Sequence, residues 1–198
     1  MAFFQFNKPF FLLIAICWVQ FAVAQNEPTL PVSYVEIEPE GLVYNIDLQY
    51  KDYHLSGLAV FKQEEKGFHV VIVSKVGMSL MEFVLGEQAT EWIKVIPGKD
   101  SKMILNHVEK DFRLLLLTPL HQPKKAKWKN RSVLKVKKKL KLKLKVSDGN
   151  VVYAETRQWI NLIKGFAKYT YTENQPVPEK VFLSKRFIDM EIELKRMN

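Results

Sequence analysis

The chain has almost no cysteine: among its 198 residues, Cys17 stands alone. A single cysteine excludes an intramolecular disulfide and any metal site built from several cysteines. The fold must therefore be held together by a packed core, and the 47% of apolar residues are enough to build one.

The chain also lacks an apolar run of the length that crosses a membrane, which is about 20 residues. Near the N-terminus, Lys8 precedes ten unbroken apolar residues at positions 10–19, and Gln20 ends that run. Ala22 and Ala24 then supply the small residues that precede a cleavage position after Ala24. This order is typical of a secretory signal peptide.

We therefore expect residues 1–24 to be a signal peptide and residues 25–198 to form one exported domain. Cys17 is preceded by Ile16 rather than by a small residue, so we expect it to be removed with the signal peptide and not lipidated. The predicted location is the periplasm, where the domain is soluble or peripherally bound to a membrane.

Acidic residues are absent from one stretch, residues 124–145, which holds twelve Lys or Arg. Without that stretch the chain is slightly acidic, so the net charge of +9 belongs to one segment. From 134 to 146 every odd position is lysine and the even positions are apolar except Lys138, a period of two that predicts one long strand with a lysine face. That face consists of Lys135, Lys137, Lys139, Lys141, Lys143 and Lys145.

The lysine face has three interpretations. It is a solvated surface that hinders aggregation, a docking site for an anionic membrane surface, or a nucleic-acid site. Trp128 is the one aromatic residue in the stretch that could stack a base, and export removes the protein from nucleic acid, so we expect no nucleic-acid partner.

The remaining pattern predicts an antiparallel meander of about ten strands with one helix. The expected strands are 42–50, 53–62, 67–75, 79–85, 90–96, 134–146, 151–157, 160–164, 166–173, 180–183 and 188–195. A helix is expected to begin after Asp100 or Ser101 and to end near Leu117, before Pro119.

Catalytic signatures are missing. The four histidines are scattered, and the spacing of His107 and Asp111 supplies only two ligands for a metal. Neither a nucleophile elbow nor a phosphate-binding glycine loop is present. We expect no enzymatic activity, no cofactor and no metal.

Large apolar residues fall on strand positions that share one side of the predicted sheet, and two helix residues face them. They form either a packed core or the wall of an apolar cavity, and both interpretations stay open. The set is Phe61, Phe68, Val70, Ile72, Met81, Phe83, Leu85, Phe112 and Leu115.

Four segments carry a resemblance: residues 53–58, 76–78, 105–115 and 188–195. Together with the order of signal peptide, meander, helix and further meander, they resemble an exported envelope family of the Bacteroidota type, similar to the LolA/LolB-like group of lipoprotein carriers and receptors. The resemblance implies a mainly β fold, in which a curved antiparallel sheet forms an open half-barrel with one principal helix packed against it. In that group the apolar hollow holds acyl chains.

The expected function is binding of a lipid or acyl chain, with a role in lipid or lipoprotein handling in the envelope. The expected partner is a lipid or an acylated protein, and the protein is expected to act as a monomer. The alternative is a non-transporting envelope protein that docks on an anionic membrane or a protein partner through its lysine-rich strand.

Overall fold

The computed structural model divides the chain into two units, Met1–Leu30 and Pro31–Asn198. It describes residues 32–38, 40–98, 101–118, 126–130, 133–136, 140–147, 150–158, 165–173, 175–185 and 189–197, all within the second unit. The predicted signal peptide, with Cys17, lies outside the described residues, as does the strand predicted at 160–164.

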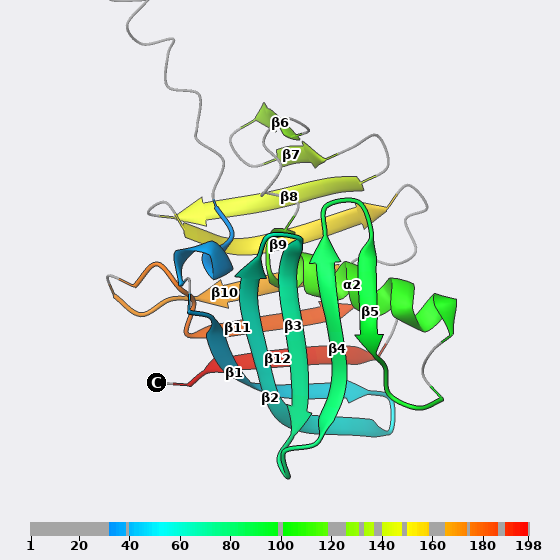
Figure 1. The fold of residues 1–198 in the computed structure, drawn as a ribbon. Coiled ribbons are helices and arrows are strands. Elements are labelled where there is room, and N and C mark those ends of the chain that lie inside the picture. Colours follow the sequence, from blue (N-terminus) through cyan, green and yellow to red (C-terminus); the bar gives the residue numbers. More distant parts are fainter. Residues whose placement is uncertain are drawn as a thin grey trace, which may run out of the picture. The chain divides into compact units, whose positions relative to one another are not determined.

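The described residues form one antiparallel sheet of twelve strands with a single α-helix and a short 3-10 turn (Figure 1). The sheet is curved and does not close, so the mainly β fold with one principal helix is confirmed. The elements are η1 (Tyr34–Ile37), β1 (Leu42–Tyr50), β2 (Tyr53–Glu64), β3 (Gly67–Ser74), β4 (Ser79–Gly86), β5 (Thr90–Lys94), α2 (Lys102–Leu115), β6 (Ala126–Asn130), β7 (Val133–Val136), β8 (Leu140–Ser147), β9 (Asn150–Gln158), β10 (Gly165–Thr170), β11 (Lys180–Lys185) and β12 (Met190–Arg196).

Two meanders make up the sheet, and they join where the first strand meets the last. The strand order is β5-β4-β3-β2-β1-β12-β11-β10-β9-β8-β7-β6. Each meander pairs sequence neighbours, and the β1–β12 pair is the long-range contact that unites them. The strands β5 and β6 stand at the two edges of this order.

The lysine-rich segment differs from the prediction. The single long strand expected at 134–146 is wrong: β7 and β8 are separate strands that pair antiparallel, with Lys135 opposite Lys141. The chain therefore reverses between Val136 and Leu140. In the sequence, the period of two fails at Lys138. A further strand, β6, precedes them in the chain at Ala126–Asn130, outside the strands that were expected.

The helix α2 is packed against the inner face of the sheet, which curls around it (Figure 1). The Ser101 side chain accepts a hydrogen bond from the Ile104 N–H and caps its first turn. Phe112 lies edge-on to Phe83, with ring centroids 5.2 Å apart, and 6.3 Å from the ring of Phe61. These rings form the centre of the core.

Three buried hydroxyl groups hold the C-terminal end of α2. Tyr169 donates to the carbonyl of Leu114 at 2.6 Å, Tyr34 donates to Leu115 at 3.0 Å, and Ser33 donates to Leu116. The last carbonyl groups of a helix have no N–H donors within the helix, so these three hydroxyl groups supply the missing hydrogen-bond donors. Burial raises the pKa of both Tyr34 and Tyr169 well above its ordinary value, which keeps the hydroxyl protons in place as donors.

Candidate functional site

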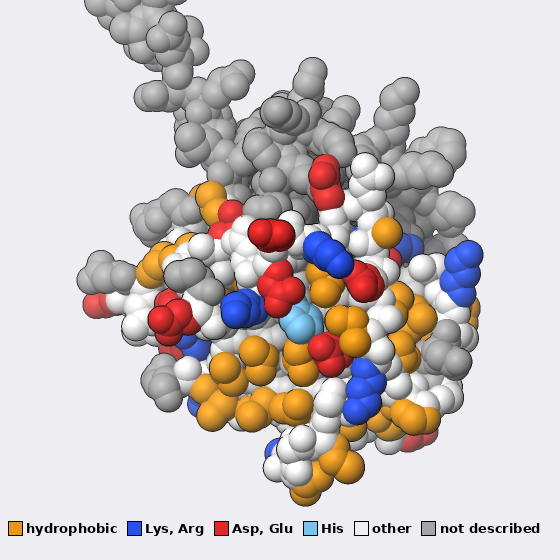
Figure 2. Space-filling model, viewed as in Figure 1, with side chains coloured by type: hydrophobic (Ala, Val, Ile, Leu, Met, Phe, Trp, Pro, Cys, Tyr) orange, Lys and Arg blue, Asp and Glu red, His pale blue; other side chains and the backbone are white. Residues whose placement is uncertain are grey.

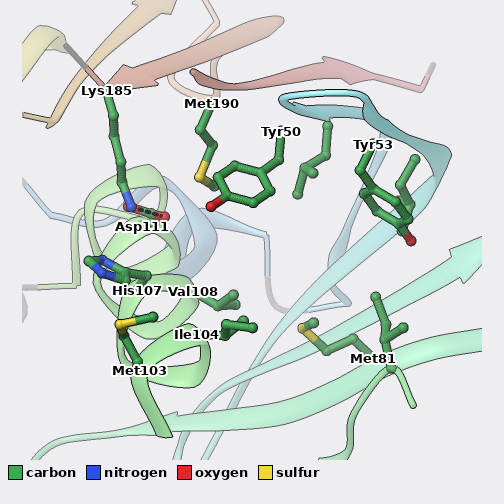
Figure 3. A pocket seen from close by; sticks show the side chains of 13 residues that line it. Tyr50, Tyr53, Met81, Met103, Ile104, His107, Val108, Asp111, Lys185 and Met190 are labelled. Carbon is green, nitrogen blue, oxygen red and sulfur yellow. Dashed lines mark ion pairs between the residues drawn. The ribbon is translucent and has the colours of Figure 1, made fainter. Parts of the chain in front are cut away.

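A cavity of about 430 Å³ lies beside α2, along its residues 103–111, at one end of the sheet (Figure 3). Antiparallel pairing brings the β1–β2 turn and the β11–β12 connection to this same end. The volume is within the range of roughly 300–1,000 Å³ that is usual for small-molecule sites.

The sheet contributes a row of side chains that runs across four neighbouring strands. Tyr53 of β2 pairs with Tyr50 of β1, Tyr50 pairs with Met190 of β12, and Met190 pairs with Lys185 of β11. All four line the cavity. A second paired row, Leu48 and Leu55, lies two residues further along the strands and lines it as well, because alternate residues of a strand share a face.

The helix contributes one of its faces. Met103, His107 and Asp111 follow one another at a spacing of four, and Ile104 and Val108 do the same beside them. Residues four apart lie on one side of a helix, which explains why all five line the cavity. The cavity wall is therefore built from two regular patterns, one of period two and one of period 3.6.

The cavity is open at its mouth. Tyr50 and Tyr53 are 41% and 42% exposed, and Met103 is 70% exposed, although all three line the cavity. Large exposed apolar side chains on a soluble surface mark candidate contact sites when they gather together. Tyr50 and Tyr53 form such a pair at the β1–β2 turn, and Met103 lies apart from them on the first turn of α2 (Figure 3).

Two opposite charges face each other in the wall of this otherwise apolar cavity. The Nζ atom of Lys185 lies 2.6 Å from Oδ2 of Asp111, and the two side chains are only 4% and 5% exposed. Burial raises the pKa of Asp111 to about 6, although the nearby Lys185 acts in the opposite direction. Burial, with help from Lys185 and Lys110, lowers the pKa of His107, so this ring is neutral at pH 7.

Of the nine residues expected to form an apolar site, Met81 lines this cavity. The other eight are buried and do not line it, and among them Phe61 and Phe83 contact Phe112 of α2. Sequence reasoning missed the cavity wall at Tyr50, Tyr53 and Lys185. A signal for Lys185 existed, since it continues the buried alternate positions of β11.

The expected lysine face is described in part. In β8, Leu142 and Leu144 are fully buried while Lys145 is exposed and lies over the ring of Tyr153, 5.5 Å from its centroid. Lys143 is opposite Glu155 on β9. Lys137 and Lys139 lie outside the described residues.

Histidines on the outer face of the sheet pair with carboxylates. His69 contacts Glu64 through Nδ1 and Glu82 through Nε2, each at 3.0 Å, and His54 contacts Asp47 at 2.8 Å. Figure 2 shows acidic and basic side chains around a histidine on this face. In the described part of the chain, no three metal-ligating side chains are placed to hold a metal ion.

In the same part of the chain, no helix has the length and apolar character that spanning a membrane requires. No model of a known protein family matches the sequence, and no curated protein matches it either. The cavity and its lining are therefore the basis on which a function is proposed.

Proposed function

We propose that this protein binds the acyl chain of a lipid or of an acylated protein in the cavity beside α2. We further propose that it acts after export, in the periplasm, in the handling of lipids or lipoproteins, and that it catalyses no reaction. The observation that carries the proposal is the cavity of about 430 Å³, walled mainly by apolar side chains and open at Tyr50, Tyr53 and Met103.

The expected affinity follows from the lining. Each methylene group that leaves water for an apolar wall contributes about 0.8 kcal/mol, so eight of them contribute about 6 kcal/mol before ordering costs. The site is also preformed, because Arg113 ties α2 to the sheet through the Gly86 carbonyl at 2.8 Å. A preformed site loses less free energy on binding.

The experiment is extraction and mass spectrometry of lipids from the purified protein, together with titration of the lipid-free protein with the uncharged probe N-phenylnaphthylamine. The proposal expects co-purifying acyl species and saturable probe fluorescence. Met81→Trp fills the cavity and should abolish both signals. Met197→Trp places the same side chain after β12, at the opposite end of the sheet, and should leave both signals intact. Binding that survives in Met81→Trp would contradict the proposal.

A second candidate function is docking of the lysine-rich strands on an anionic membrane surface. The observation that favours it is the register of β7 and β8, which sets Lys135 directly opposite Lys141. Like charges opposite one another destabilise a sheet, and an anionic surface would relieve that repulsion.

Vesicles that contain anionic lipid test this second function. Binding should weaken with salt and should be lost when Lys139, Lys141, Lys143 and Lys145 are replaced by Gln. Binding that is unchanged in this variant would reduce the lysine face to a solvated surface.

A further inference from the structure

The polar groups of the cavity are gathered on one side of it. Asp111 and His107 stand one helical turn apart on α2, and Lys185 reaches them from β11 (Figure 3). The opposite side is apolar, with Ile104 and Met81. A purely hydrocarbon ligand would leave buried charges against its chain, which is unfavourable. The cavity therefore suits a molecule with one polar end and one apolar end.

The local charge favours an anion at the polar end. The titratable groups that line it are His107 and Asp111 from α2, Lys185 from β11 and the Tyr50 hydroxyl from β1 (Figure 3). Lys110, which is exposed on α2 and outside the lining, adds its positive charge from nearby. With His107 neutral, the lining holds one ammonium group and one carboxylate, and the exposed Lys110 adds a second ammonium group outside it. The surplus is one positive charge.

Hydrogen-bond donors are available in the same place. An ammonium group has three N–H donors, and Asp111 is the one ion-pair partner of Lys185 among the described residues. His107 is half-buried and has no hydrogen-bond partner within the described part of the chain. A neutral imidazole has one N–H to donate.

We propose that the ligand is a single-chain amphiphile with a carboxylate head, such as a free fatty acid, and that Lys185 and His107 bind its two carboxylate oxygens. The chain then lies against Met81, Leu55 and Tyr50 toward the mouth. This inference rests on the proposed function, because it names the ligand of the same cavity. The volume of about 430 Å³ is near the lower end for ligand sites, which favours one chain over a diacyl lipid.

The repulsion between this head group and Asp111 is limited. Burial has already raised the pKa of Asp111 to about 6. An arriving carboxylate raises it further, so that the two carboxylates can share a proton while Lys185 remains bound to both.

The test compares three ligands of equal chain length as competitors of N-phenylnaphthylamine at pH 7: dodecanoate, dodecanol and dodecyltrimethylammonium, each below its micelle concentration. Dodecanoate should bind about tenfold more tightly than dodecanol, because a charge-assisted hydrogen bond is stronger than a neutral one. Dodecyltrimethylammonium should bind most weakly.

Two variants show where the preference arises. Asp111→Leu with Lys185→Met replaces the whole ion pair by apolar groups, a change that buried pairs often tolerate. In this double variant dodecanoate should bind no more tightly than dodecanol. Lys180→Met removes a lysine of the same strand that pairs on the outer face with Glu193, and should keep the preference.

The outcomes separate the two proposals. Equal affinity for dodecanoate and dodecanol, or a preference that survives in the double variant, overturns the carboxylate inference and leaves the acyl-chain function standing. Failure of the probe and of every chain to bind overturns the acyl-chain function itself.

Discussion

Replacing Lys185 with methionine removes the positive member of the buried ion pair and leaves the Asp111 carboxyl group behind. The pair is close, at 2.6 Å, and almost fully buried. Removing one partner of such a pair typically costs about 3–5 kcal/mol, because the other charge remains in an apolar environment. We expect a loss of this size in the free energy of unfolding at pH 8.

The loss depends on pH in a direction that the structure sets. Burial raises the pKa of Asp111 from 3.8 to about 6 even with Lys185 present, and without that lysine the pKa rises further. A carboxyl group whose pKa is raised by folding loses stability as pH rises from its unfolded pKa through its folded pKa. If Lys185→Met adds one pKa unit, the loss at pH 5 is smaller than at pH 8 by about 1.4 kcal/mol. Release of His107 from the influence of Lys185 acts in the same direction.

The assay is urea unfolding of both proteins at pH 5 and pH 8. Lys180→Met is the matched control: it removes a lysine from the same strand, but its partner Glu193 and the lysine itself are partly exposed. Exposed pairs contribute at most about 1 kcal/mol. An equal loss at both pH values, or a loss no larger than that of the control, would refute the reasoning.

Three further substitutions test contacts that hold the helix and the strands together. Tyr169→Phe removes the hydroxyl that donates to Leu114, and should lower the free energy of unfolding by about 1–3 kcal/mol in urea titration, with an unchanged midpoint as the contrary result. Gly57→Ala places a Cβ atom 2.0 Å from the carbonyl oxygen of Val73, so we expect a drop in the thermal midpoint equivalent to about 1–3 kcal/mol. Gly165→Ala, whose Cβ would meet nothing closer than 3.5 Å, should be tolerated, and equal effects of the two alanines would contradict this account.

Strand positions could be predicted well because alternation is a local property. The first five strands begin where they are expected and differ by at most two residues at their ends; β2, for example, ends at Glu64 rather than at 62. The lysine-rich segment shows the limit of the method. From Leu134 to Val136 in β7 and from Leu140 to Val146 in β8 the odd positions are lysine and the even positions are apolar, so the alternation runs on from one strand to the next as if they were a single strand. In the sequence, the interruption of this alternation at Lys138 is the one sign of two strands.

The cavity was harder to locate, and the reason is geometric. Periodicity indicates which face of the sheet a side chain lies on. It does not indicate whether that side chain packs against the helix in the core or lies in the cavity wall. Phe61, Phe83 and Met81 share the inner face, yet the rings of Phe61 and Phe83 meet Phe112 in the core while Met81 lies in the cavity wall. The position of the helix depends on contacts such as Tyr169 with Leu114, which join residues far apart in the chain.

The unclosed sheet has a consequence for how separate molecules meet. Its order ends at β5 and β6, and an edge strand presents backbone donors and acceptors to any other strand. The edge strand β6 carries Lys127 and Lys129 within its five residues. Two copies that approach through β6 therefore bring four positive charges together, and electrostatic repulsion opposes a continuous intermolecular sheet. This repulsion is screened by salt over a distance of about 10 Å at 0.1 M, so a higher ionic strength weakens the protection of this edge.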